Sequence, residues 1–353
     1  MSIVIAVIVF GVIVVIHEMG HFITAKKSGV LVEEFAVGMG PKILSKQYGE
    51  TLYSLRAFPI GGFCKMLGED DQSTDNRAIC KKSIAQRFLI LSGGAIMNLI
   101  LAFLIFLFLV AFNGFTSTKI HSVVDGSPAQ QLGLQPGDKI IRLNGSIINI
   151  YDDLTYEISL NNGTSMPISY ERNGKRHNSE ITPYKYEDGS YKVGIMFEGR
   201  TGIFEKSVEG IQRAGIFESL GNAACEIVFY VKATVGGIIR LITLQLPMEQ
   251  MSGPIGIVTV IGQAYDASIQ NGVWIMVMQM LYLCAILSAN LGVFNLLPLP
   301  GLDGGRLVFV LFEAIRKKPL PAEKEGLVHF IGLVLLMILA VFIAYSDIRK
   351  LFI

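Results

Sequence analysis

Long apolar blocks, separated by polar stretches, dominate the pattern of this chain. Four blocks come close to the roughly twenty apolar residues that a helix needs to cross a bilayer. They lie at residues 3–25, 88–112, 273–294 and 327–345. The pattern therefore predicts four transmembrane helices.

A fifth apolar block, residues 223–246, contains Glu226, Lys232 and Arg240. Ionised side chains are costly at bilayer depth. We therefore predict an amphipathic helix that lies on the membrane surface or against the other helices, in preference to a fifth span.

Residues 33–66 combine apolar residues with glycine and proline, around short β-like runs such as TLYSLRAF. The stretch is too apolar for an ordinary loop and too interrupted for a helix. Irregular backbone is tolerated at membrane depth only where protein or water satisfies it. We expect a β-hairpin or small sheet tucked against the helices.

Residues 115–198 change to short alternating runs punctuated by glycine and asparagine. A short helix is expected at 128–132, then a turn at Pro136-Gly137-Asp138, then a strand that ends in an Asn-Gly turn. These signals predict a soluble, mostly β domain between the second and third spans.

Composition and charge support a membrane protein with one soluble part. Hydrophobic residues make up 51% of the 353 residues and charged residues 17%, whereas soluble domains carry about 25% charged residues. The net charge of +1 argues against a nucleic acid partner. The four cysteines show no CxxC spacing, so we expect no disulfide framework.

Basic residues gather in the loop after the first span and in the loop before the last. They are Lys26, Lys27, Lys81, Lys82 and Arg87, then Arg316, Lys317, Lys318 and Lys324. The positive-inside rule makes both loops cytoplasmic. Four spans then put the soluble domain on the extracytoplasmic side, whereas a fifth span would separate the two basic loops.

The first span contains the sequence HEMGH, residues 17–21. His17 and His21 are four residues apart and share one helix face, so both imidazoles can bind one zinc ion. Glu18 is placed to act as the general base on a zinc-activated water. The bare motif also occurs by chance, but ionisable residues inside a span need a partner or a function.

A zinc site of this kind needs a third protein ligand. The candidates are His329, His121, His177 and Asp303. The soluble domain places His121 and His177 on the wrong side. Asp303 follows Pro298 and Pro300, which unwind the end of the third span and can aim its carboxylate. A turn-capping role for Asp303 stays open, and His329 is treated as a packed or interfacial histidine.

Together these motifs resemble the site-2 protease family of intramembrane zinc metalloproteases, of the regulator of sigma-E protease type. HEMGH resembles the family's HExxH motif, and NLLPLPGLDGG resembles its N-x-x-P-x-P-x-L-D-G signature, whose aspartate is the third zinc ligand. SGPIGI, GMGPKI and LRAFPIGGFCKMLGE also match. GSPAQQLGLQPGDKIIRLNG looks like part of a PDZ domain. The resemblance covers nearly the whole chain.

The resemblance implies four regions and one cofactor. These are 1–112, with two spans and a membrane-reentrant β-segment at 33–66; 115–198, a PDZ domain; 199–270, a linker with an amphipathic membrane-associated helix; and 271–353, with the last two spans. Zn²⁺ would be bound by His17, His21 and Asp303. Two features depart from the family: GAIMN has Ala95 where the family has proline, and only one PDZ domain is found where some relatives carry two.

The resemblance also implies a substrate class. Substrates would be single-pass membrane proteins already cut by another protease, such as anti-sigma factors or remnant signal peptides, in a bacterial inner membrane. A helical substrate must unwind before hydrolysis, and a β-strand edge could hold it extended. The expected substrate-binding residues are Asn295, Asn98, Gly61, Gly62 and Phe63. For Asn98, a helix–helix hydrogen bond remains an equal alternative.

The sequence leaves three alternatives. The PDZ domain would exclude bulky substrates or recognise a new C-terminus. A catalytically silent PDZ membrane scaffold would keep the fold without the chemistry. A zinc transporter is disfavoured because transporters of that kind usually contain internal repeats, and none is visible.

Overall fold

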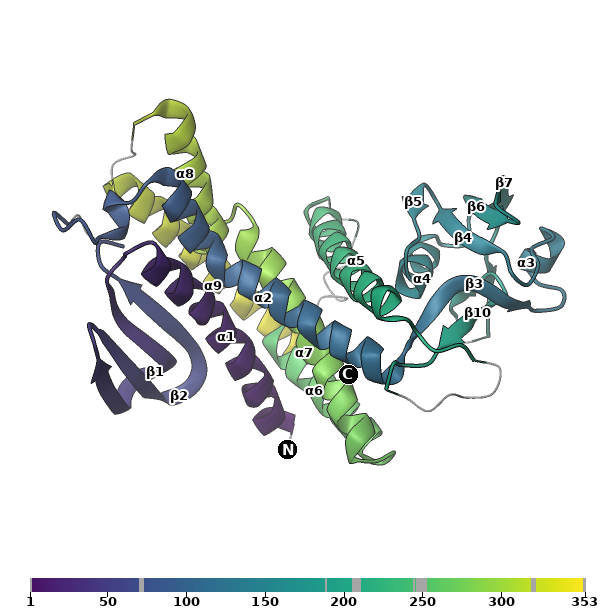
Figure 1. The fold of residues 1–353 in the computed structure, drawn as a ribbon, viewed down its shortest axis with the longest axis horizontal. Helices are drawn as coiled ribbons and strands as arrows, with labels where there is room; N and C mark the ends of the chain where they lie inside the picture. Colours follow the sequence, from purple (N-terminus) through teal and green to yellow (C-terminus); the bar gives the residue numbers. More distant parts are fainter. Residues whose placement is uncertain are drawn as a thin grey trace. The chain divides into compact units, whose positions relative to one another are not determined.

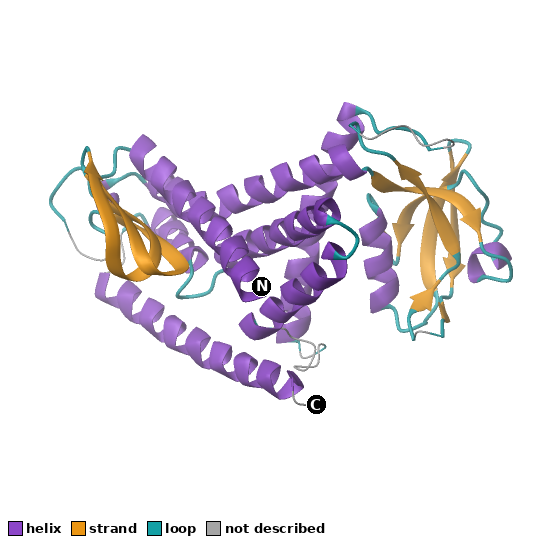
Figure 2. Cartoon of the chain, turned by 90° about the horizontal axis from the view of Figure 1, so that it is seen from below, coloured by secondary structure: helices purple, strands orange, loops and turns teal. Residues whose placement is uncertain are grey.

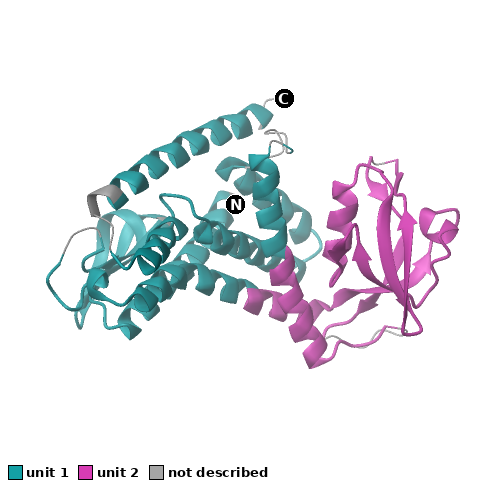
Figure 3. Ribbon diagram, turned by 90° about the horizontal axis from the view of Figure 1, so that it is seen from above, with its two compact units in different colours: residues 1–102, 230–353 teal, residues 103–229 magenta. Residues whose placement is uncertain are grey.

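The computed structural model describes residues 2–69, 73–187, 189–204, 211–243, 245, 253–318 and 322–351. The chain forms two compact units, shown in different colours in Figure 3. The helical unit comprises Met1–Ala102 with Tyr230–Ile353, and the β-rich unit comprises Phe103–Phe229. Helices α2 (Ile84–Asn113) and α5 (Ile216–Ile242) continue from one unit into the other.

Four helices of the described residues are long and apolar enough to cross a membrane (Figure 1). They are α1 (Ser2–Lys27), α2, α7 (Val273–Leu296) and α9 (Ala322–Leu351). These positions confirm the four predicted apolar helices. Helix α5 does not meet the same criterion, in agreement with its charged residues.

Two further helices in this unit were not predicted. Helix α6 (Pro254–Ile269) packs against α1, α7 and α9. The buried carboxylate of Asp347 in α9 accepts hydrogen bonds from the backbone amides of Gly253 and Gly256, at 3.1 and 2.8 Å. A carboxylate at a helix N-terminus satisfies otherwise unpaired amides, so Asp347 ties α9 to the start of α6.

Helix α8 (Asp303–Arg316) begins where an unwound segment was expected. The unwinding itself is real but short: α7 ends at Leu296, and Leu297 is extended. Pro298 and Pro300 cannot donate backbone hydrogen bonds, which explains the break. Asp303 is therefore the first residue of a new helix.

Small residues let the helices approach closely. A Cβ added at Gly20 of α1 would overlap the carbonyl of Gly93 in α2. A Cβ at Gly292 of α7 would lie 3.0 Å from the carbonyl oxygen of Ala95. Close backbone approach at glycine and alanine is typical of helix packing in membranes.

Strands β1 (Val32–Tyr48) and β2 (Thr51–Met66) form the predicted antiparallel hairpin, seen as the two-stranded sheet beside the helices in Figure 2. Its base belongs to a buried cluster that includes Ala25, Val32 and Met66. Its far end is exposed, with Leu44 at 66% and Tyr48 at 76%. The hairpin is thus anchored at the end of α1.

The β-rich unit contains an antiparallel sheet in the order β10-β3-β4-β6-β7, with β5 paired to β4. The strands are β3 (Phe115–Val123), β4 (Lys139–Leu143), β5 (Ser146–Ile147), β6 (Met166–Arg172), β7 (Lys175–Ile181) and β10 (Ile195–Arg200), with a separate pair β8 (Tyr184–Lys185) and β9 (Tyr191–Lys192). Two helices accompany them, α3 (Pro128–Gln131) and α4 (Tyr151–Leu160). The core is apolar and includes Ile120, Ile140 and Met166.

Local signals in this unit were predicted correctly. The expected short helix is α3, capped by the side chain of Ser127, which accepts from the amide of Gln130. The Asn-Gly turn joins β4 to β5, with φ of 52° at Asn144 and 83° at Gly145. Positive φ at both positions is the conformation that favours Asn-Gly in two-residue turns.

Candidate active site

Helix α1 presents two buried histidines on one face. His17 is 8% exposed and His21 is 6% exposed. Their Nε2 atoms lie 3.2 Å apart, and their rings meet edge to face. The four-residue spacing places them one helical turn apart, as the sequence predicted.

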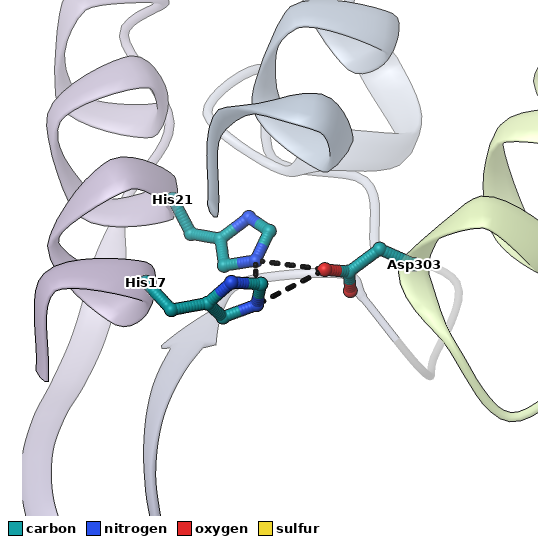
Figure 4. Close-up of side chains that lie close together, drawn as sticks. All are labelled: His17, His21 and Asp303. Carbon is teal, nitrogen blue, oxygen red and sulfur yellow. Dashed lines mark hydrogen bonds and ion pairs between the residues drawn. The ribbon is translucent and has the colours of Figure 1, made fainter. Parts of the chain in front are cut away.

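Asp303 faces both histidines from the start of α8 (Figure 4). Its Oδ2 lies 3.1 Å from Nε2 of His17 and 3.2 Å from Nε2 of His21. The glycines that follow allow the turn, because a Cβ at Gly304 would overlap the carbonyl of Leu297. Arg306, on the same helix, forms an ion pair with Glu69.

The spacing of these atoms fits zinc. The three ligand atoms lie within 4.8 Å of one another, and the separations involving the Nε2 atoms and Oδ2 are 3.1–3.2 Å. Tetrahedral zinc with bonds of about 2.0–2.2 Å holds its ligand atoms about 3.3–3.6 Å apart. Two imidazoles and a carboxylate also leave a fourth position open, as in catalytic zinc sites.

Helix α2 forms the wall behind the histidines. Nδ1 of His21 lies 2.8 Å from the carbonyl oxygen of Ile90, and Nδ1 of His17 lies 3.3 Å from the side-chain amide of Asn98. Gly94 lies between them in sequence, and a Cβ there would lie 2.7 Å from Nε2 of His17 and overlap Nε2 of His21. The absence of a side chain at Gly94 gives both rings their space.

Glu18 follows His17 on α1 and is half-buried. Its carboxylate lies within electrostatic reach of His17, His21 and Asp303. Gly62 of β2 is its neighbour, because a Cβ at Gly62 would lie 3.4 Å from Cγ of Glu18. A carboxylate beside three convergent ligand atoms is suited to proton transfer during hydrolysis.

The other candidates for a third ligand have different surroundings. The ring of His329 contacts Phe309, and its Nδ1 accepts from the amide of Gly301 at 3.1 Å. His177 stacks on Tyr170 in the β-rich unit. His121 is exposed on β3. Asp303 is therefore the candidate whose geometry matches the two histidines.

The expected substrate-binding residues are distributed around the site. Gly62 borders Glu18, whereas Gly61 approaches Met39 and the ring of Phe63 stacks under the guanidinium of Arg56. Asn295 is half-buried in the last turn of α7. Asn98 is fully buried against His17. The role of each in substrate binding stays a prediction.

Sequence reasoning missed the contributions of Gly94 and the carbonyl of Ile90. The Gly93-Gly94 pair inside an apolar block was a usable signal, since such pairs mark close helix contacts. A backbone carbonyl gives no sequence signal, because every residue carries one.

Fold and site together define a helical, membrane-type protein with a candidate metal centre between its helices. The family model described as "Peptidase family M50" matches residues 5–339. The chain therefore belongs to peptidase family M50, the site-2 proteases, and is a zinc metalloprotease by family.

Relatives match along the full length. A Clostridium perfringens protein named as a zinc metalloprotease is 37% identical, covering 99% of this chain and 98% of its own. Zinc metalloprotease RasP of Geobacillus kaustophilus is 29% identical, covering 99% and 98%. Regulator of sigma-W protease RasP of Bacillus subtilis is 29% identical, covering 98% of each chain.

Among solved structures, the PDZ domain of an SdrC-like protein of Listeria monocytogenes covers 23% of this chain at 23% identity, with a TM-score of 0.22. A similarity of this size carries no argument. The resemblance of residues 115–198 to a PDZ domain therefore rests on their sequence motif.

Proposed function

We propose that this chain hydrolyses a peptide bond within or next to the transmembrane segment of a membrane protein. His17, His21 and Asp303 are the zinc ligands, and Glu18 is the general base. One observation carries this proposal: three ligand atoms meet at zinc spacing, two of them from a helix apolar enough to span a membrane.

Zinc, when bound, supplies a Lewis acid and lowers the pKa of a coordinated water. Glu18 accepts the proton of the attacking water and returns it to the leaving amine. The two histidines and Asp303 would hold the metal, and the burial of the two histidines limits the water that reaches the site. An electrostatic centre shielded from water stabilises developing charge more strongly than an exposed one.

The hairpin provides the substrate site in this proposal. Gly62 of β2 borders Glu18 without a side chain of its own, so an extended peptide can approach the carboxylate. Pairing with a strand edge would keep the substrate unwound while it is cut. Gly61, Phe63 and Asn295 are the other residues proposed to line its path.

The proposed substrates are single-pass membrane proteins that another protease has already shortened. One relative is named regulator of sigma-W protease, which favours a substrate that controls a sigma factor. Remnant signal peptides have the same chemistry, an apolar helix with a small remaining ectodomain.

The positive-inside rule sets the proposed orientation in a bacterial inner membrane. Lys26 and Lys27 at the end of α1, beside the candidate site, lie towards the cytoplasm. The β-rich unit is then extracytoplasmic, and as a PDZ domain it would exclude substrates with bulky ectodomains.

Cleavage of a tagged single-span substrate in reconstituted membranes tests the proposal. Wild type should cleave, whereas Glu18→Gln should lose turnover and keep its zinc. Equal cleavage by both proteins would refute the role of Glu18. A wild type that neither cleaves nor binds zinc would leave the catalytically silent scaffold.

A further inference from the structure

We propose that Asn98 is a positioning residue for the metal centre. Its side-chain carbonyl accepts the Nδ1 proton of His17, which leaves Nε2 of that ring free to bind the metal. The inference rests on the proposed zinc site, and it assigns Asn98 a role other than substrate contact.

His21 shows what a ligand histidine in this site requires. Its Nδ1 lies 2.8 Å from the carbonyl oxygen of Ile90. A carbonyl can only accept, so Nδ1 carries a proton, and Nε2, which faces Asp303, is the nitrogen left to bind a metal. Metal-binding histidines usually donate their second nitrogen in this way, which fixes both tautomer and ring orientation.

His17 needs the same kind of acceptor, and Asn98 is the group in place. Nδ1 of His17 lies 3.3 Å from Nδ2 of Asn98. Asn98 is 0% exposed, and its Oδ1 has no hydrogen-bond partner among the described residues. Turning the amide over brings this buried acceptor to Nδ1 of His17.

The amide can therefore serve two states of the site. With Nδ2 towards the ring, Nδ1 of His17 accepts, and its Nε2–H points at Oδ2 of Asp303, 3.1 Å away. With Oδ1 towards the ring, Nδ1 donates and Nε2 is free for zinc. A side-chain amide offers both a donor and an acceptor at one position.

The placement of Asn98 on α2 supports a dedicated role. Ile90, Gly94 and Asn98 are spaced by four residues and lie on one helix face. Ile90 contacts His21, Asn98 contacts His17, and Gly94 lies against both rings. Ser288 of α7 donates to the backbone carbonyl of Asn98 at 2.8 Å and fixes this part of the helix. A fully buried amide is costly in an apolar span unless it is bonded.

The zinc affinity of the full-length protein in detergent, measured against a chelator, tests the proposal. Asn98→Leu keeps the volume and removes the acceptor, so zinc should bind about 10–100-fold more weakly. Asn98→Asp keeps only acceptors and should bind zinc within about threefold of wild type or more tightly. Ser92→Ala, the matched control, removes a buried hydroxyl of α2 that donates to the carbonyl of Phe88, and should leave the affinity unchanged.

The order of the variants separates positioning from packing. A purely structural Asn98 would tolerate Leu better than a buried carboxylate, so the affinity of Asn98→Asp would fall below that of Asn98→Leu. That order, or equal affinity in all variants, overturns the proposal. A wild type that fails to bind zinc overturns the proposed metal site instead, so the two failures are distinguishable.

A second measurement does not depend on how well Asn98→Asp folds. The protein has five histidines, so ¹⁵N-histidine labelling gives a tractable spectrum. In zinc-saturated wild type, two ring Nδ1–H protons should exchange slowly, those of His17 and His21. In zinc-saturated Asn98→Leu, only that of His21 should remain slow. Slow exchange of both protons in the variant would contradict the proposal.

Discussion

Polar groups in the two units of this chain have opposite surroundings. In the β-rich unit, Asp138 is 1% exposed. It accepts from the amide of Gln135 at 2.9 Å and from the guanidinium of Arg172 at 2.6 and 2.7 Å. In the helical unit, His17, His21 and Asp303 point their ligand atoms at a common point.

The difference distinguishes polar groups that stabilise the fold from polar groups that can bind a ligand. A buried carboxylate with a cation and a backbone donor is satisfied, and breaking the pair lowers stability. Imidazole nitrogens and a carboxylate oxygen aimed at one point satisfy one another poorly, because most of these atoms are acceptors when the histidines are neutral. A convergent set of this kind indicates a ligand, and the following experiments test the contrast.

The largest effect is expected from Asp303→Ala. Loss of a direct ligand should weaken zinc binding by more than the roughly 100-fold that loss of a supporting residue costs. The metal-free variant should keep the thermal unfolding midpoint of the metal-free wild type, since the proposed role of Asp303 is to bind the metal. Zinc competition and thermal unfolding of the metal-free protein measure the two effects separately. A large drop in the midpoint with unchanged zinc affinity would reverse the assignment.

Gly94→Ala should weaken zinc binding by at least about tenfold, because the added Cβ would lie 2.7 Å from Nε2 of His17 and displace the rings. Gly11→Ala in α1 is a matched control, since nothing lies within 4 Å of a Cβ there. Helix content should be unchanged in both, as alanine favours helix over glycine. Equal zinc affinity in the two variants would show that the rings do not need this space.

Asp138→Ala should have the opposite effect, a loss of stability without a loss of zinc binding. Removal of charged hydrogen bonds should destabilise the β-rich unit by about 1.5–3 kcal/mol, measured by hydrogen exchange of residues 115–198 in the full-length protein. Zinc affinity should not change. A variant that loses zinc instead would mean that the two units share the determinants of the site.

The carboxylate of Asp138 also determines how the stability of the β-rich unit depends on acid pH. Burial alone would raise the pKa of Asp138, but the hydrogen bonds from Arg172 and from the amide of Gln135 outweigh it and hold this pKa below its usual 3.8. A carboxyl with a depressed pKa stabilises the fold above its unfolded pKa and loses that contribution as the pH falls through its folded pKa. Protection of residues 115–198 should therefore fall below about pH 4 in wild type and change less in Asp138→Ala.

Much of this molecule was predictable because strong local patterns specify it. The four long helices follow from apolar length, the hairpin from interrupted β-like runs, and His17 and His21 from helical spacing. Asp303 was one of four candidates, because sequence spacing does not show which distant segment reaches the histidines. In the structure, α8 begins at Asp303, and this identifies the segment that reaches the histidines.

The parts that were missed depend on tertiary contacts. Helix α6 has 16 residues, too few for a span, and it is held by neighbours such as Asp347, far away in sequence. His21 is positioned by the backbone carbonyl of Ile90, and both histidine rings fit because Gly94 has no side chain. None of these has a local pattern that distinguishes it before the helices are packed.

Glu226 extends the comparison to a partly buried carboxylate whose Oε2 has no hydrogen-bond partner among the described residues, and the smallest effect is expected here. Burial, followed by the charges of Asp152 and Asp153, raises its pKa from 4.5 to about 8. A raised carboxyl pKa favours the fold below about pH 4.5, and this contribution is lost as the pH rises through about 8. Amide protection in α5, corrected for the intrinsic pH dependence of exchange, should therefore fall as the pH rises from about 4.5 to about 8, because local opening can expose the charge without unfolding the unit. Glu226→Gln should remove this pH dependence. A variant with the same pH profile as wild type would show that another group titrates, and would leave Glu226 as an ordinary surface-facing residue of the helix.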